Sequence, residues 1–156
     1  MRLILVRHGH AGRKDQWHRP DRLRPLDARG QRQAQHLVQV LVPLQPSRIV
    51  SSPYKRCFQT MAPAADKLGL RVHQASALAP DAPARALALI RRLTVPHSPT
   101  GVVLCTHGEV LGAVLDEFAE QDGLRLERRP PGLKGCAWVL EFRRGKLVAA
   151  RYVPPR

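Results

Sequence analysis

Long apolar runs and cysteines are both scarce in this chain of 156 residues. The opening apolar run, Leu3 to Val6, is too short for a signal peptide or a membrane span. Three cysteines are an odd number, which argues against a closed disulfide framework. These absences exclude a small disulfide-stapled scaffold, and they favour a reducing, cytoplasmic compartment.

Acidic residues are few as well. The chain has 12 Asp and Glu against 26 Lys and Arg, which gives a net charge of +14. Residues 1–35 carry a net +6 and residues 125–156 a net +7, whereas residues 36–124 carry only +1. A field of this sign favours anionic partners such as phosphorylated metabolites, nucleotides, nucleic acid or acidic membranes. The alternative is a solvated basic surface without a functional role.

Strand and helix patterns alternate as far as residue 121. Apolar segments predict strands at 3–6, 48–51, 71–73 and 101–105. Apolar positions at helical spacing predict helices with buried faces at 34–42, 58–68, 86–93 and 111–118. The pattern predicts one α/β domain over 1–156, with a mostly parallel sheet between two helical layers. A C-terminal antiparallel hairpin is expected at 137–142 and 147–153, around Arg144-Gly145.

Polar residues that could take part in catalysis or binding follow three of the predicted strands. In parallel α/β sheets, ligands bind outside the carboxyl ends of the strands. The segments at these ends are Arg7-His8-Gly9, Ser51-Ser52-Pro53 with Arg56 one turn later, and Thr106-His107-Gly108-Glu109. Two histidines and two arginines are therefore expected to converge at one crevice.

This set of residue types suits the handling of a phosphoryl group. Two arginines can clamp a phosphoryl dianion through their planar donors. A neutral imidazole nitrogen can attack phosphorus when an acceptor, often a backbone carbonyl, holds the other ring nitrogen. The second histidine can stabilise the equatorial oxygens of the transition state. Gly9 would leave room for backbone approach, and the helix that opens at Gly108 would favour an anion.

Arg7-His8-Gly9 after a buried strand resembles the signature of the histidine phosphatase superfamily, which includes cofactor-dependent phosphoglycerate mutases and small phosphohistidine phosphatases. Residues 25–34 resemble the family's L-T-x-x-G-x-x-Q-A helix start, and residues 51–60 resemble its S-S-P-x-x-R-A-x-Q-T segment. Residues 106–110 resemble its second histidine motif. The closest likeness is to SixA-type enzymes and to the phosphatase domain that follows a Nudix domain in some actinobacterial nucleotide hydrolases.

The resemblance implies that His8 is a nucleophile that forms a phosphohistidine. It implies that Arg7 and Arg56 clamp phosphate and that His107 is a phosphate ligand. The alternative for each residue is a structural role. His8 would cap the strand, the two arginines would be solvated surface residues, and His107 would be a core histidine with its hydrogen bonds made. Gly9, Gly108 and Lys14 are the expected substrate-binding residues.

The general acid is where the chain departs from the family pattern. Larger family members place a Glu shortly after the third strand, but no Glu occurs here between Gly69 and His107. Asp81 is the carboxylate in that stretch, although it also fits a helix N-cap before an early proline. Glu109 is the other candidate, although a first-turn Glu is also favoured by the helix dipole. The departure favours substrates whose leaving group needs little protonation, such as a polyphosphate.

The loop after the first strand and a later basic segment complete the predicted crevice. Trp17 lies in this loop together with His10, Arg13, Lys14 and His18. One interpretation is that these residues contact the rest of the substrate, and the other is that they form an ordinary polar loop. We also expect Arg125, Arg128, Arg129 and Lys134 to lie around the same crevice and steer anions. Trp138 and Cys105 are expected in the core.

Signatures of other phosphoryl-transfer chemistries are absent. The chain has no Cys-x5-Arg loop, no Asp-x-Asp pair and no Gly-x4-Gly-Lys-Ser/Thr loop. His8 and His10 lack a third ligand at suitable spacing, so neither a metal site nor an organic cofactor is expected.

The sequence supports three functional hypotheses. The leading one is a phosphatase acting through phospho-His8 on a small phosphorylated metabolite or nucleotide. The second is a SixA-type protein phosphohistidine phosphatase, and the third is a non-catalytic polyanion-binding module that keeps the fold. Membrane binding is not expected, nucleic acid ranks below small phosphorylated molecules as a partner, and the oligomeric state is left open.

Overall fold

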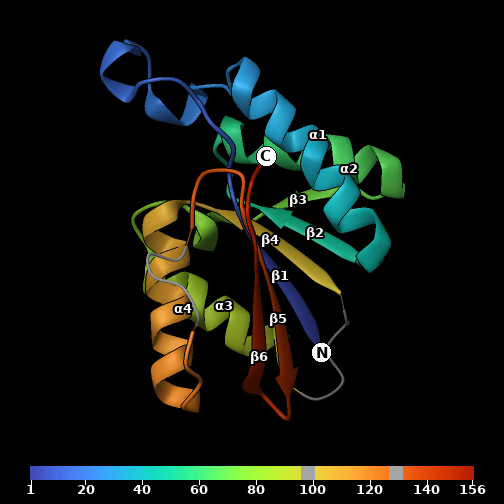
Figure 1. Cartoon of the computed structure of the whole chain (residues 1–156). Coiled ribbons are helices and arrows are strands. Elements are labelled where there is room, and N and C mark those ends of the chain that lie inside the picture. Colours follow the sequence, from blue (N-terminus) through green and yellow to red (C-terminus); the bar gives the residue numbers. More distant parts are fainter. Residues whose placement is uncertain (96–100, 127–131) are drawn as a thin grey trace.

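The computed structural model describes residues 1–95, 101–126 and 132–156. Six strands form one sheet in the order β3-β2-β4-β1-β5-β6 (Figure 1). They are β1 (Arg2–Arg7), β2 (Arg48–Ser51), β3 (Val72–Gln74), β4 (Val102–Thr106), β5 (Ala137–Arg143) and β6 (Lys146–Val153). Strands β1 to β4 are parallel, and β5 is antiparallel to both β1 and β6. The predicted, mostly parallel sheet with a C-terminal hairpin is confirmed.

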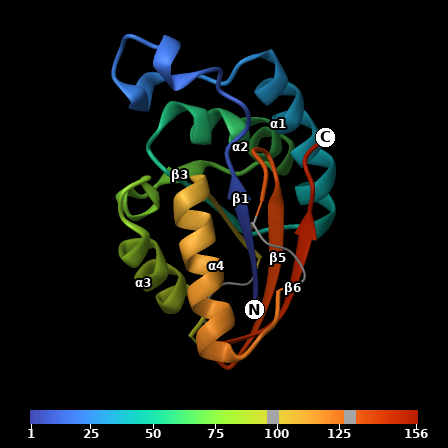
Figure 2. The same ribbon diagram turned by 60° about the vertical axis from the view of Figure 1, so that its left-hand side comes forward.

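Helices cover both faces of this sheet. They are α1 (Ala28–Leu41), α2 (Lys55–Leu68), α3 (Pro83–Leu93) and α4 (Gly108–Asp122). Figures 1 and 2 show the α1–α2 pair and the α3–α4 pair on opposite faces. Leu3 and Leu5 belong to the core on the α3–α4 face, whereas Ile4 and Val6 belong to the core on the α1–α2 face. Burial on both sides explains the continuous apolar run of β1 and confirms the predicted three layers.

Short 3-10 turns connect these elements. They are η1 (Lys14–Gln16), η2 (Asp21–Leu23), η3 (Val42–Leu44) and η4 (Ser76–Leu78). Two of them, η1 and η2, lie in the long segment between β1 and α1, which stands away from the sheet in Figures 1 and 2. This segment joins the end of β1 to the start of α1 and therefore borders the region where the predicted site lies.

Several local predictions are confirmed by the backbone. The Asp27 side chain caps α1, because its Oδ1 accepts a hydrogen bond from the Gly30 amide at 2.9 Å. Gly69 ends α2 in the left-handed region, with φ of 68°. The β5–β6 turn places Arg144 and Gly145 at positive φ, as a tight hairpin turn requires. Trp138 and Cys105 are buried in the core as expected.

One local prediction was wrong, and two strands are present with shifted bounds. Strands β3 (Val72–Gln74) and β4 (Val102–Thr106) each begin one residue later than predicted. The N-cap of α3 is Ala82, not Asp81, because the helix begins at Pro83 and the capping position directly precedes it. Asp81 therefore has an exposed side chain in the turn before the cap.

Across the described ranges, we find no helix with both the length and the apolar character needed to cross a bilayer.

Candidate active site

The four predicted phosphate-handling residues come together at the carboxyl ends of β1 and β4, which are neighbours in the sheet. Arg56 Nε lies 3.3 Å from His8 Nε2. The rings of His8 and His107 meet edge to face, with their centroids 5.2 Å apart. Arg7 ends β1 directly before His8, and its guanidinium lies against Gly108 at the start of α4.

The His8 imidazole is buried and has a defined orientation. Its Nδ1 lies 2.8 Å from the Gly9 carbonyl oxygen. Because a carbonyl only accepts, Nδ1 carries the proton and Nε2 keeps its lone pair. Burial, and after it the positive surroundings of His107, Arg56 and Arg7, hold the pKa of His8 well below its usual range. The side chain is therefore a neutral imidazole with a free ring nitrogen at neutral pH.

This lowered pKa gives a testable pH dependence. We expect His8 to remain protonated on Nδ1 alone as the pH falls through 6.5, the usual value for histidine, and to gain its second proton only at lower pH. Nitrogen-15 NMR of the labelled imidazole measures both the tautomer and the titration, with His8→Ala assigning the resonance. Half-protonation of His8 at or above pH 6.5 would contradict the geometry.

Arg56 is oriented by a residue that the motif analysis missed. Its Nη1 donates to the Asp21 backbone oxygen at 2.9 Å, and its Nη2 donates to Asp21 Oδ2 at 3.0 Å. The other carboxylate oxygen, Oδ1, accepts from Arg24 Nε at 2.9 Å. With both terminal nitrogens held, the remaining Nε–H of Arg56 faces His8.

Asp21 itself is held in the ionised state. Partial burial opposes ionisation, but the hydrogen bond from Arg24 and the charge of Arg56 lower the pKa of Asp21 overall. A carboxylate of this kind is a poor proton donor at neutral pH. The sequence signal that could have found it is an Asp three residues before an Arg, within a loop otherwise rich in cations.

Arg7 occupies a cradle that only glycine can provide. A Cβ at Gly108 would lie 2.6 Å from Arg7 Cζ, so any side chain there would displace the guanidinium. Arg7 Nη1 donates to the Gly132 carbonyl at 2.9 Å. Its Nε is buried and has no hydrogen-bond partner within the described part of the chain. Gly108 thus makes room for Arg7 in addition to opening α4.

His107 is fixed by three side chains around it. Its Nε2 lies 2.9 Å from Ser52 Oγ and 3.6 Å from Cys57 Sγ, and the Tyr54 ring meets it edge to face. Cys57 stands where the family segment quoted above has alanine. Burial raises the pKa of this thiol, but hydrogen bonds with Cys105 and His107 outweigh that effect and lower it. Cys57 is a second residue of the site that the motif analysis did not single out.

The remaining motif residues hold the loop that carries His8. The Gly9 amide donates to Thr60 Oγ1 at 3.0 Å, and the His10 amide donates to Gln33 Oε1 at 2.8 Å. Gly30 lies so close to this loop that a Cβ there would be 2.0 Å from the His10 carbonyl oxygen. The glutamine, threonine and glycine of the motifs on α1 and α2 therefore act as structural supports.

Three predicted site residues lie at the surface. Glu109 is in the first turn of α4, Asp81 precedes the cap of α3, and Lys14 begins η1, and all three side chains are exposed. Gly9 and Gly108, by contrast, lie directly beside His8 and Arg7. Neither candidate acid is buried next to His8.

The predicted ring of basic residues is only partly present. Lys134 lies beside the site, because the amide of the next residue, Gly135, donates to the Arg7 and His8 carbonyls at 3.1 and 3.0 Å. Its side chain is half-buried, and burial followed by the nearby charges of Arg7, Arg24 and Arg56 lowers its pKa. The prediction for Arg125 was wrong. This residue follows the C-terminal end of α4, whereas the site lies at the helix's start. Arg128 and Arg129 lie outside the described residues.

The His8 and His10 rings turn to different partners. His8 Nδ1 faces the Gly9 carbonyl, whereas His10 Nδ1 pairs with the Asp27 carboxylate. Among residues 1–95, 101–126 and 132–156, no three His, Cys, Asp or Glu side chains are grouped as metal ligands would be.

Comparisons with known proteins agree with this geometry. Residues 3–80 match the histidine phosphatase superfamily (branch 1). An 8-oxo-(d)GTP phosphatase of Mycolicibacterium smegmatis is 35% identical over 155 residues, 98% of this chain, and the chain spans 48% of that relative's length. The protein histidine phosphatase SixA complexed with tungstate is 20% identical, with a TM-score of 0.77 over 99% of this chain and 96% of that one. A phosphohistidine phosphatase SixA from Agrobacterium tumefaciens is 23% identical, with a TM-score of 0.79 over 99% and 97%.

The chain belongs to the histidine phosphatase superfamily, whose profile matches half of its length. These two structural neighbours, both under 25% identical, show that the fold extends over nearly the whole chain.

Proposed function

We propose that this chain hydrolyses a small phosphorylated metabolite or nucleotide through a phosphohistidine on His8. The observation that carries the proposal is the His8 ring, whose Nδ1 is held by the Gly9 carbonyl while its Nε2 faces Arg56. In the first step, the Nε2 lone pair forms a bond to phosphorus as the bond from phosphorus to the leaving-group oxygen breaks. In the second step, a water oxygen attacks phosphorus, the N–P bond breaks, and inorganic phosphate leaves.

The surrounding groups supply electrostatic stabilisation in this mechanism. Arg7 and Arg56 bind the phosphoryl oxygens, and His107 stabilises the charge that develops on them. Gly9 and Gly108 let the backbone and the Arg7 guanidinium approach closely. We propose residues 1–156 as one histidine phosphatase domain built around this site.

A nucleotide is the substrate class that the site supports best. Asp21 is ionised beside Arg56, and Asp81 and Glu109 are exposed. None of these three carboxylates is therefore a buried carboxylic acid that could protonate a leaving alkoxide. A phosphate leaving group departs as an anion and needs little such help. The 35% identical relative is named as a nucleotide phosphatase, which supports the same class.

A SixA-type protein phosphohistidine phosphatase is the second candidate. The observation in its favour is the extent of the fold similarity, because the chain covers 96–97% of two SixA structures. A chain of this length has few insertions that would close the site over a small molecule. A phosphohistidine substrate also has a nitrogen leaving group that needs little protonation.

A substrate panel with phosphoenzyme trapping tests the proposed function. We expect the wild-type chain to release phosphate from GDP faster than from a phosphohistidine protein, and to form an acid-labile phosphoenzyme. Faster release from the phosphohistidine protein would select the second candidate. Absence of turnover on p-nitrophenyl phosphate, GDP and phosphohistidine protein alike would overturn the phosphatase proposal and leave the polyanion-binding module.

We also propose Asp21 as a positioning residue for Arg56. Asp21→Ala removes the carboxylate that holds Arg56 Nη2, so Nε no longer points at His8 in one orientation. We expect kcat to fall about tenfold or more, since loss of an orienting partner typically has an effect of this size. Steady-state kinetics separate kcat from KM, and Asp21→Asn should recover part of kcat because its amide oxygen still accepts.

A matched control for Asp21 is the exposed Asp15, whose side chain forms an ion pair with the exposed Arg13. Asp15→Ala should leave kcat within twofold, roughly the scatter expected for a surface change. Equal kcat values for Asp21→Ala and the wild type would contradict the positioning role.

A further inference from the structure

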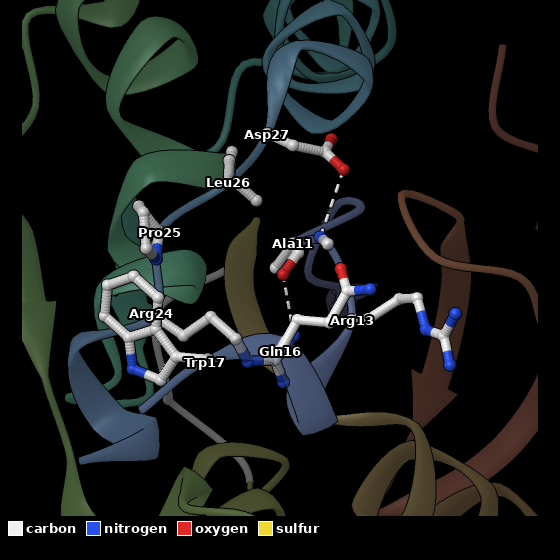
Figure 3. A pocket seen from close by; sticks show the side chains of 9 residues that line it. Ala11, Arg13, Gln16, Trp17, Arg24, Pro25, Leu26 and Asp27 are labelled. Atoms are coloured by element: carbon white, nitrogen blue, oxygen red, sulfur yellow. Dashed lines mark hydrogen bonds between the residues drawn. The ribbon is translucent and has the colours of Figure 1, made fainter. Parts of the chain in front are cut away.

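A cavity of about 300 Å³ lies beside the loop that carries His8. Figure 3 shows its walls, which come from the start of that loop, from η1 and from the segment that leads into α1. We call it the Trp17 pocket. Its lining residues are Ala11, Gly12, Arg13, Gln16, Trp17, Arg24, Pro25, Leu26 and Asp27. Ala11 and Gly12 follow His8 by only three and four positions, so a short stretch of one loop joins the pocket to the site.

The walls of the Trp17 pocket are held in place by hydrogen bonds. Trp17 Nε1 donates to the Pro20 carbonyl at 3.1 Å, which fixes the plane of the indole. Arg24 Nη1 donates to the Ala11 carbonyl at 2.8 Å, and the Gly12 amide donates to Asp27 Oδ2 at 3.0 Å; both bonds are drawn in Figure 3. A pocket preorganised in this way spends little free energy on ordering when a ligand enters.

Two connections join the Trp17 pocket to the phosphoryl site. The first is Asp21, whose two carboxylate oxygens bind Arg24 of the pocket and Arg56 of the site at 2.9 and 3.0 Å. The second is Lys134, whose half-buried ammonium lies within electrostatic range of Arg7 and Arg56 on one side and of Arg24 and Asp27 on the other. Asp21 and Lys134 therefore adjoin both the pocket and the phosphoryl site.

We propose that the Trp17 pocket holds the base of a nucleoside phosphate whose terminal phosphoryl group lies at His8. This inference rests on the proposed function. The indole of Trp17 offers a flat aromatic face on which a base stacks, and Pro25 and Leu26 give apolar walls. Gln16 adds an amide group for the edge of a base. The Asp27 carboxylate holds the wall in place, because it accepts from the Gly12 and Gly30 amides.

The composition of the pocket walls favours a base over a sugar as the ligand. A sugar presents hydroxyl groups on every side and needs a polar partner for most of them. The pocket instead combines one aromatic face and several apolar side chains with four polar side chains, most of which already have partners. Arg24 binds Ala11 and Asp21. The Asp27 carboxylate accepts from the Gly12 and Gly30 amides. A planar base with hydrogen-bonding groups at its edge fits this arrangement.

The chain offers a matched control on the other side of η2. A second cavity of about 290 Å³ is lined by Arg22, Leu23, Pro53, Lys55, Phe58 and Gln74. Phe58 is an aromatic residue that is 41% exposed. Phe58→Ala therefore removes an accessible aromatic side chain near the same segment without touching the Trp17 pocket.

Turnover by the full chain tests the proposal. We expect Trp17→Ala to raise KM for GDP about tenfold or more, as loss of a stacked aromatic does, while KM for p-nitrophenyl phosphate changes less than twofold. Phe58→Ala should leave both values within twofold. Equal effects of Trp17→Ala on the two substrates, or no effect on GDP, would overturn the inference while leaving the phosphatase function standing. Absence of wild-type turnover on both would instead defeat the proposed function.

Fluorescence gives a second test that does not need turnover. The chain has two tryptophans, and Trp138 is only 1% exposed, so a base can stack on Trp17 alone. We expect GDP to quench the fluorescence of the His8→Ala variant, whereas pyrophosphate and glucose 6-phosphate do not, and Trp17→Phe should remove the quenching. Equal responses to GDP and pyrophosphate, equal responses to GDP and glucose 6-phosphate, or quenching that survives Trp17→Phe, would overturn the inference.

Discussion

Replacement of His8 by alanine is expected to lower kcat/KM at least about a thousandfold and to abolish the acid-labile phosphoenzyme. His8 Nε2 faces Arg56 at 3.3 Å, and alanine leaves no nitrogen at that position to bond to phosphorus. The arginines remain, so phosphate binding should survive in part. Steady-state kinetics and trapping with radiolabelled substrate measure the two effects.

The control for this prediction is another histidine on the same sheet. His73 lies in β3 and is exposed, so His73→Ala should keep both turnover and phosphoenzyme. Circular dichroism and thermal unfolding of the two variants show whether either has lost its fold. A His8→Ala variant that is folded and still forms an acid-labile phosphoenzyme would remove His8 from the mechanism.

Replacement of Gly30 by alanine is expected to destabilise the fold by about 3 kcal/mol or more, because overpacking against backbone is more costly than against a flexible side chain. The new Cβ would lie 2.0 Å from the His10 carbonyl oxygen and 3.0 Å from its amide nitrogen, so α1 must move away from the loop that carries His8. Activity should fall together with stability, since the same loop positions the nucleophile. Urea unfolding measures the change in the free energy of unfolding.

Arg29 is the matched position for this second prediction. It precedes Gly30 in the first turn of α1 and is exposed, so Arg29→Ala should change the free energy of unfolding by less than roughly 0.5 kcal/mol. Equal stability of Gly30→Ala and Arg29→Ala would show that the loop adjusts without cost. The close approach of Gly30 to His10 would then not be needed for the fold.

The sequence predicted the layers and the strand ends because these depend on local patterns. A four-residue apolar run followed by a polar loop favours a buried strand. Asp27 marks a helix start through its side-chain carboxylate, and Gly69 marks a helix end through its backbone freedom. The convergence of His8 and His107 followed from the parallel sheet, in which the carboxyl ends of neighbouring strands meet. These inferences needed no knowledge of side-chain contacts.

The residues that orient the site could not be found in this way. Asp21 reaches Arg56 across 35 positions of the chain, and Cys57 reaches His107 across 50. The spacing of Asp21 and Arg24 indicates a local ion pair, but the contacts with Arg56 and His107 depend on how a loop and a helix pack over the sheet. Asp81 failed as a cap for a related reason: the start of α3 at Pro83 decided which residue became the cap.

Arg7 Nε is buried and has no acceptor in the described part of the chain. A buried donor left unpaired costs about 1–3 kcal/mol, and in the proposed mechanism a bound phosphoryl group accepts from the Arg7 guanidinium. An anion that binds only the folded state raises the free energy of unfolding with the logarithm of its concentration. We therefore expect the melting temperature to depend on the buffer anion, so that a value measured in phosphate describes the complex and not the free chain.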